Sequence, residues 1–155
     1  MRFEGFEPVF DSISEILILG SFPSVKSRAE NFYYGNRQNR FWAMLATAFD
    51  CEVPTSVPEK RALVLTHKLA LWDIVTSCSI KGSMDADIRD YEVADLHVVM
   101  NGANIKKILL NGSKAYEIFI KHYPELGGIA KKMPSTSSAN VRYDREVWLK
   151  ELREL

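Results

Sequence analysis

The sequence predicts an α/β fold in which helices cover both faces of a central, mostly parallel four-stranded sheet. Four short apolar runs, each closed by a turn or by small polar residues, are typical of buried parallel strands. Segments with helical spacing separate these runs, and such alternation favours parallel pairing. The chain has 155 residues, the size of one domain, so we expect a single three-layer α/β/α domain over residues 1–155.

The first half of the chain holds two of the predicted strands. The apolar run over residues 13–19 ends at Gly20 and predicts the first strand, and residues 69–75 predict the second. A polar segment over residues 21–38 is long for a connection inside a compact domain, and such loops are usually functional. Helical spacing predicts a helix over residues 39–49, and a proline in the first turn favours a second one over residues 58–68.

The second half repeats this alternation and ends on a helix. It is predicted to hold a polar turn (residues 83–88), a short helix (93–100), a strand (106–110), a helix (114–122) capped by Ser113, a strand (129–133) and a terminal helix (142–155).

Composition excludes several classes of protein. Twenty basic and twenty acidic residues cancel, so a nucleic-acid partner would have to be held by a local patch. No apolar run approaches the ~20 residues that cross a bilayer, and no export signal is recognisable, so we expect no membrane partner and a cytoplasmic location. Two cysteines cannot form a four-cysteine metal or iron–sulfur site, and we expect neither a metal nor another cofactor.

Familiar catalytic and nucleotide-binding motifs are missing from the sequence. It contains no Gly-x-Gly-x-x-Gly, no phosphate-binding loop and no Gly-x-Ser-x-Gly elbow. A nucleotide-binding regulator and a serine hydrolase are therefore both disfavoured.

Small polar residues gather where the predicted strands end. Ligands of parallel α/β sheets bind at the carboxyl ends of the strands. Those ends fall at residues 20–24, 73–77, 111–112 and 133–138, and three of the four are rich in small polar side chains. We therefore expect the functional site at this edge.

The segment over residues 32–42 combines aromatic rings, amides and two arginines. Aromatic faces stack on bases, amides read base edges and arginines hold phosphates. The alternative is that Phe41 and Trp42 belong to the core, which we expect for both. For Tyr34 and Asn39, composition alone leaves simple packing slightly ahead of a ligand-binding role.

Two lysines precede a run of hydroxyl residues at positions 131–140. Hydroxyls and the free N–H groups of a helix start can hold a phosphate. A serine cap in a surface turn is an equally good interpretation of this segment.

Taken in order, these segments resemble the uracil-DNA glycosylase superfamily, and within it the hypoxanthine-DNA (deoxyinosine) glycosylase branch. The resemblance rests on Gly20-Ser21-Phe22-Pro23-Ser24, on Tyr34 followed by Asn39-Arg40-Phe41-Trp42, and on Met133-Pro134-Ser135-Thr136-Ser137-Ser138. It implies a uracil-DNA glycosylase-like fold and a site to which all three of these segments contribute.

The chain departs from the superfamily at three positions. Phe22 stands where mismatch-specific relatives carry a catalytic asparagine, and the hypoxanthine branch instead implies a downstream asparagine, which maps onto Asn39. Met133 and Ser137 replace the histidine and the leucine wedge of the second motif. The sequence does not identify the residue that stabilises an extruded nucleotide in place of the wedge.

The resemblance implies roles for ten residues. Asn39 and Asp73 are the expected catalytic residues, although Asp73 fits a strand-end capping role equally well. The expected base-binding residues are Ser21, Phe22 and Tyr34. The expected phosphate-binding residues are Ser135, Ser137, Ser138, Lys132 and Arg142.

The implied activity is that of a monofunctional DNA glycosylase of base excision repair. Its substrate would be double- or single-stranded DNA with a flipped, deaminated base, hypoxanthine first and uracil second. We expect a monomer. The alternative function is a non-catalytic module that binds damaged DNA on the same fold.

Overall fold

A four-stranded parallel sheet forms the centre of the computed structural model, which describes residues 2–23, 27–28, 31–80 and 88–154. Its strands are β2 (Ile16–Gly20), β3 (Leu69–Asp73), β6 (Lys107–Asn111) and β7 (Ala130–Met133). They pair in parallel in the order β3-β2-β6-β7. The four predicted strands and their parallel pairing are confirmed.

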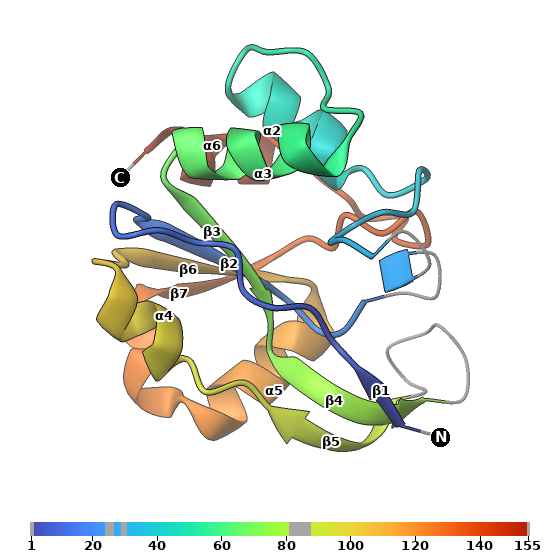
Figure 1. Ribbon diagram of the computed structural model, residues 1–155, viewed down its shortest axis with the longest axis vertical. Coiled ribbons are helices and arrows are strands. Elements are labelled where there is room, and N and C mark those ends of the chain that lie inside the picture. Colours follow the sequence, from blue (N-terminus) through green and yellow to red (C-terminus); the bar gives the residue numbers. More distant parts are fainter. Residues whose placement is uncertain (1, 24–26, 29–30, 81–87, 155) are drawn as a thin grey trace.

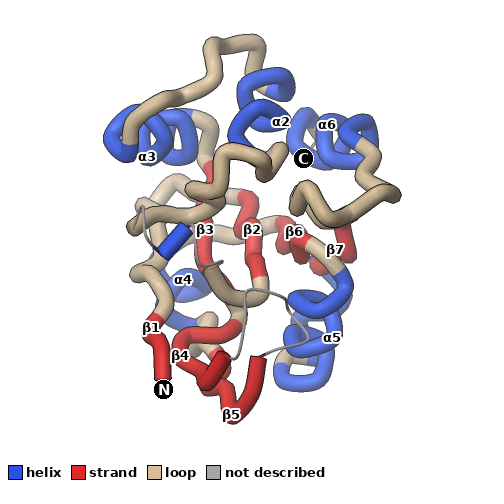
Figure 2. Tube along the Cα trace, turned by 90° about the vertical axis from the view of Figure 1, so that its right-hand side faces the viewer, coloured by secondary structure: helices blue, strands red, loops and turns tan. Residues whose placement is uncertain are grey.

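Helices cover both faces of this sheet and give the three predicted layers (Figure 1). One face carries α2 (Phe41–Ala48), α3 (Val57–Thr66) and α6 (Arg145–Arg153), and the other carries α4 (His97–Gly102) and α5 (Ser113–His122). A short 3-10 helix, η2 (Pro124–Ile129), leads from α5 to β7. The side view in Figure 2 shows the same two helical layers on either side of the strands.

Burial on both faces explains why the central strands could be predicted. All five residues of β2 and all five of β3 are buried, so each strand is an almost unbroken apolar run. Such runs are the pattern of parallel strands under two helical layers. No helix among the described residues has the length and apolar character needed to span a membrane.

A second, antiparallel sheet was not predicted. It consists of β1 (Arg2–Glu4), β4 (Val75–Ile80) and β5 (Ile88–Val93), in the order β1-β4-β5. Its central strand is hard to recognise because Ser77 and Cys78, rather than large apolar residues, occupy buried positions. The predicted helix over residues 93–100 is wrong in its first part, since β5 ends at Val93. The predicted turn lies almost wholly at residues 81–87, outside the described residues.

Two helix starts differ from the prediction. Ser113 does not cap α5 but is its first residue, and Gly112 takes the cap position with a φ of 99°, a conformation that favours glycine. The terminal helix begins at Arg145 instead of Arg142, because the Asp144 side chain accepts a hydrogen bond from Glu146 N. Arg142 therefore belongs to the loop before α6.

Candidate active site

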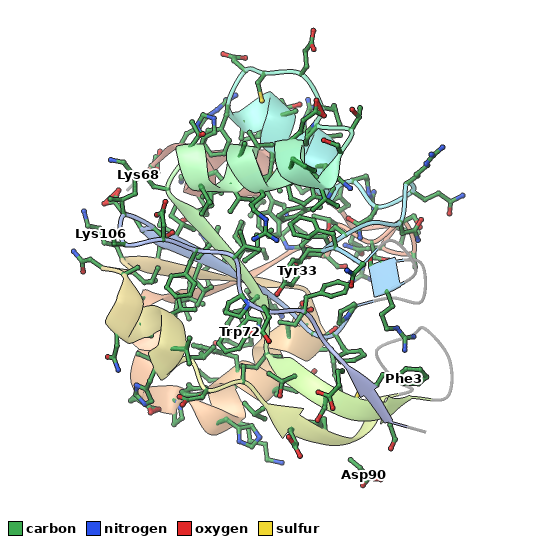
Figure 3. All side chains as sticks on the ribbon, viewed as in Figure 1. Phe3, Tyr33, Lys68, Trp72, Asp90 and Lys106 are labelled. Atoms are coloured by element: carbon green, nitrogen blue, oxygen red, sulfur yellow. The ribbon has the colours of Figure 1, made fainter. Side chains whose placement is uncertain are left out.

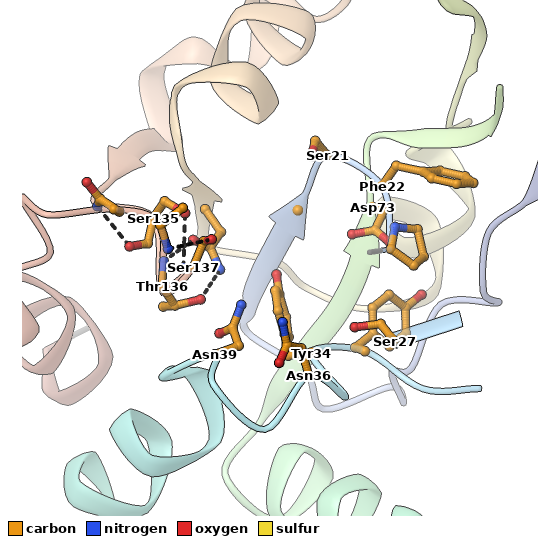
Figure 4. A pocket seen from close by; sticks show the side chains of 16 residues that line it. Ser21, Phe22, Ser27, Tyr34, Asn36, Asn39, Asp73, Ser135, Thr136 and Ser137 are labelled. Atoms are coloured by element: carbon orange, nitrogen blue, oxygen red, sulfur yellow. Dashed lines mark hydrogen bonds between the residues drawn. The ribbon is translucent and has the colours of Figure 1, made fainter. Parts of the chain in front are cut away.

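A cavity of about 390 Å³ opens at the carboxyl edge of the central sheet, where all four strands end (Figure 4). This volume lies within the roughly 300–1,000 Å³ of small-molecule sites. From β2 the chain continues to β3 on one side, and from β6 it continues to β7 on the other side. Parallel sheets bind ligands at the point between two strands whose connections diverge in this way. The cavity is lined by Gly20, Ser21, Phe22, Pro23, Ser27, Tyr33, Tyr34, Asn36, Asn39, Asp73, Asn111, Ser135, Thr136, Ser137, Ala139 and Asn140.

Gly20, the last residue of β2, lies beneath two functional groups. A Cβ atom added there would lie 2.5 Å from Asp73 Oδ1 and 3.0 Å from Tyr34 Oη. The Asp73 side chain reaches this point from the end of β3 and is only 5% exposed. A residue without a side chain at position 20 therefore leaves room for the Asp73 carboxylate and the Tyr34 hydroxyl at the floor of the cavity.

Two neighbouring tyrosines have different tasks. Tyr33 is buried and its hydroxyl donates to the carbonyl oxygen of Glu7 at 2.7 Å; burial raises the pKa of this phenol far above its ordinary value. Its own carbonyl oxygen accepts from Trp42 Nε1 at 3.0 Å. Tyr34, with a φ of 54°, turns the other way, and its ring stacks on Phe41 with 4.0 Å between centroids. Both residues line the cavity, but Tyr33, in the interior of the molecule (Figure 3), also anchors the loop through its hydroxyl.

Asn39 joins the start of α2 to the cavity. Its Oδ1 accepts a hydrogen bond from Phe41 N at 2.9 Å, the local bond by which Asn side chains favour helix starts. With the oxygen held by the backbone, the Nδ2 end of the amide points toward the cavity in Figure 4. Asn39 therefore presents a hydrogen-bond donor to a ligand.

The opposite wall is residues 135–140, which we call the serine turn. Thr136 is fully buried and exchanges two hydrogen bonds with the Asn111 amide: Thr136 N donates to Oδ1, and Nδ2 donates to Thr136 Oγ1, both at 3.0 Å. Trp148 of α6 donates from Nε1 to the Pro134 carbonyl oxygen at 2.7 Å. The turn is therefore fixed to both β6 and α6.

Arg40 has a structural role that the sequence did not reveal, since the arginines of residues 32–42 were expected to hold phosphates. Its Nη2 donates to the carbonyl oxygens of Ser137 and, at 2.8 Å, of Asn140, and its guanidinium lies 4.1 Å above the Tyr143 ring centroid. Its backbone N also donates to Thr136 O at 3.0 Å. These contacts bridge the two walls of the cavity, so Arg40 holds the serine turn in place of the expected phosphate contact.

The structure brings together seven of the ten predicted site residues. Those that line the cavity are Ser21, Phe22, Tyr34, Asn39, Asp73, Ser135 and Ser137. Ser138, Lys132 and Arg142 are exposed and are not among the described lining residues. Met133, which is buried at the end of β7, is also not among the lining residues.

Other lining residues were missed as individual contributors. Asn111 lies at a predicted strand end, and Asn36 lies in the aromatic and amide segment two residues after Tyr34. Both segments were predicted to contribute to the site, but neither asparagine was identified as a site residue. Asn140 and Thr136 lie inside the hydroxyl run. Among the described residues, no group of three or more His, Cys, Asp or Glu side chains could hold a metal ion.

Comparison with known proteins identifies the fold first. A solution NMR structure from Methanosarcina acetivorans, provisionally described as a uracil DNA glycosylase, matches with a TM-score of 0.86. The two chains are 32% identical, and the match covers 99% of this chain and 98% of the other. The fold is therefore the uracil-DNA glycosylase-like α/β fold, as the motifs implied. No protein-family model matches the chain.

Two curated relatives then identify the family. The hypoxanthine DNA glycosylase of Methanosarcina acetivorans is 36% identical over 146 residues, covering 91% of this chain and 90% of that protein. The enzyme of the same name from Methanosarcina barkeri is 34% identical, covering 92% of this chain and 90% of its own length. This chain belongs to the hypoxanthine DNA glycosylase family and is a DNA glycosylase, which confirms the resemblance seen in its motifs.

Proposed function

We propose that this chain hydrolyses the N-glycosidic bond between hypoxanthine and deoxyribose in DNA, which releases the base and leaves an abasic site. The observation that carries this proposal is that Tyr34, Asn39 and Ser137 line one cavity large enough for a nucleobase. The names of the two curated relatives support the same substrate. Water is the nucleophile, so the enzyme is monofunctional and starts base excision repair.

The base reaches the cavity by leaving the stack, because the glycosidic bond cannot be reached inside a duplex. A mispaired, deaminated base costs the least to extrude. The ring of Tyr34, supported on one side by Phe41, gives the extruded base a stacking surface. Such stacking contributes roughly 1–3 kcal/mol per base. The main chain of Ser21 and Phe22 forms the adjoining wall.

Asn39 and Asp73 read the edge of the base. Hypoxanthine presents the O6 acceptor beside the N1–H donor. The Asn39 Nδ2 group donates to the first, and the Asp73 carboxylate accepts from the second. Adenine presents the reverse arrangement, an amino donor beside an N1 acceptor, and is rejected. Uracil carries the same carbonyl and N–H pair as hypoxanthine, which makes it the second substrate.

The same Asn39 donor assists bond cleavage. The bond between C1′ and the base nitrogen breaks with its electron pair on the base, while the sugar gains oxocarbenium character. A fixed donor at O6 stabilises the negative charge that develops on the base. Water adds to C1′, and the departing base takes up a proton. Asn39 also helps to orient this water, because an amide positions a nucleophile without titrating.

The serine turn holds the DNA backbone beside the extruded nucleotide. Ser135 Oγ accepts from Ser137 N at 3.2 Å, and Ser137 Oγ accepts from Ala139 N at 3.3 Å, so each hydroxyl keeps its proton to donate to a phosphate oxygen. Ser138 adds a third hydroxyl. The exposed cations Lys132 and Arg142 supply positive charge in a chain whose net charge is zero.

The enzyme acts as a monomer, in either duplex or single-stranded DNA, in the cytoplasm. The residues given roles above all belong to this one sequence. No partner subunit is required to complete the proposed chemistry.

A panel of duplexes containing hypoxanthine, uracil, xanthine, a thymine mismatch or undamaged adenine tests this function directly. We expect alkali-sensitive strands from hypoxanthine first and uracil second, and none from adenine. Release of none of these bases, with retained binding to damaged duplexes, would instead support the non-catalytic alternative.

A further inference from the structure

Val141 stands out because its side chain is 95% exposed, whereas the other exposed large apolar residues in the described part of the chain lie between 36% and 56%. A single exposed apolar side chain is ordinary on protein surfaces. Its position is what gives it meaning, because Ala139 and Asn140, immediately before it, line the cavity. Val141 is therefore an exposed apolar residue directly next in the chain to the cavity wall.

The backbone on both sides of Val141 is held by hydrogen bonds. Asn140 Oδ1 accepts from Arg142 N at 3.0 Å, which closes a short turn around position 141. Asn140 Nδ2 donates to Ser135 O at 2.9 Å, and the Asn140 carbonyl oxygen accepts from Arg40 Nη2 at 2.8 Å. Valine also has few rotamers, since it branches at Cβ. The fold thus keeps a stiff apolar side chain pointed away from its own core.

An extruded nucleotide leaves a gap in the base stack that matches such a side chain. Proteins that distort DNA insert apolar wedges into the stack, where they replace lost stacking contacts. Ser137, inside the serine turn, has no apolar surface to offer. We propose that Val141 enters the gap and keeps the base extruded; this inference rests on the proposed function. Val141 is a positioning residue, because it touches neither the released base nor C1′.

The first test measures binding and requires no cleavage. Val141→Ala, Val141→Leu and wild-type protein are titrated with a duplex containing a tetrahydrofuran abasic analogue and with the matched intact duplex. The control is Ile13→Ala, because Ile13 is 56% exposed and precedes β2 at the opposite edge of the sheet. We expect Val141→Ala to lower the preference for the abasic duplex about tenfold, the effect of withdrawing two methyl groups from an apolar contact.

Val141→Leu and Ile13→Ala should both retain the wild-type preference. An unchanged preference in Val141→Ala, or no preference in the wild-type protein, would overturn the inference. Because this readout does not depend on base release, a chain that fails to cleave deoxyinosine would refute the proposed function without deciding the role of Val141.

The second test compares duplex with single-stranded DNA, which distinguishes a residue that acts as a wedge from one that acts in the pocket. Single-turnover release of hypoxanthine is measured in duplex and in single-stranded DNA. Val141→Ala should slow release from the duplex about tenfold and leave the single strand unaffected, because an unpaired base needs no wedge. Equal slowing on both forms would contradict the wedge and place Val141 in the pocket or the fold.

Discussion

Arg40 Nη2 donates a hydrogen bond to the Asn140 carbonyl oxygen at 2.8 Å, although the two residues are 100 positions apart. The same guanidinium bonds the Ser137 carbonyl and stacks on Tyr143. One side chain next to Asn39 therefore sets the position of the wall that is proposed to hold DNA phosphates. The amide proposed to read the base and the turn proposed to hold phosphates are thus linked through two adjacent residues, Asn39 and Arg40.

Replacing Arg40 with lysine should loosen the serine turn without removing the charge. Lysine has no planar fork of donors, so it cannot bond two carbonyls and stack on a ring together. We expect about a tenfold higher Kd for a deoxyinosine duplex, measured by fluorescence anisotropy with a labelled duplex. An unchanged Kd would show that the turn does not depend on this clamp.

Gly20→Ala tests the floor of the cavity. The new Cβ would lie 2.5 Å from Asp73 Oδ1, too close for either atom to keep its place. Displacing the Asp73 carboxylate and the Tyr34 hydroxyl should reduce the single-turnover rate at least a hundredfold, since small misplacements of reacting groups have effects of this size. The matched control is Gly128→Ala in η2, where no atom lies within 4 Å of the added Cβ. Equal rates in the two variants would argue against a tight fit at Gly20.

Glu151 gives the fold a predictable acid sensitivity. Its Oε2 lies 2.6 Å from Lys131 Nζ and its Oε1 3.0 Å from Lys107 Nζ, which ties α6 to β7 and β6. The Lys131 hydrogen bond, aided by Lys107, holds the pKa of Glu151 below its ordinary 4.5. A carboxyl with a lowered pKa in the folded state stabilises the fold above its unfolded pKa and loses this contribution as pH falls through the folded pKa.

Glu151→Gln should therefore lower the free energy of unfolding by about 1 kcal/mol at pH 7, or the Tm by about 2–4 °C. The difference from wild type should shrink as pH falls below 4.5. Thermal unfolding followed by circular dichroism at several pH values measures it. Glu146→Gln serves as control, because the Glu146 side chain is 76% exposed and lies 4.0 Å from Arg145. A pH-independent difference would mean that Glu151 acts through packing.

Arg142→Ala should change the salt dependence of DNA binding more than it changes the rate of base release. One lost phosphate contact lowers the slope of log K against log salt by about one and weakens binding equally for damaged and intact duplexes. Ser138→Asp should weaken binding in the same way by adding a negative charge. Unchanged slope and affinity in both variants would remove these residues from the phosphate surface.

Most of the central sheet could be predicted because a strand buried on both faces is a continuous apolar run in the sequence. Residues 16–19 and 69–72 are apolar throughout, and the alternation of such runs with helices predicted parallel pairing, although it did not predict the strand order. The antiparallel strand Val75–Ile80 is no such run, since Ser77 and Cys78 fill buried positions with small side chains.

The site could be predicted as far as its residues lie in short motifs. Tyr34 and Asn39 belong to one aromatic and amide segment, and the serine turn is continuous in the sequence. Arg40 and the Asn111–Thr136 pair could not be predicted, because their partners are determined by the packing of distant segments. The exposure of Val141 beside the lining residue Asn140 likewise depends on contacts that only the folded chain makes.

Single-turnover release of hypoxanthine by the Asn39→Asp variant tests the central claim most directly. Aspartate keeps an oxygen that can accept from Phe41 N and so preserves the start of α2, but it removes the Nδ2 donor that faces the cavity. We predict a rate at least a hundredfold below wild type, the usual effect of losing one donor that stabilises developing negative charge, with unchanged thermal stability. A wild-type rate in this variant would contradict the account.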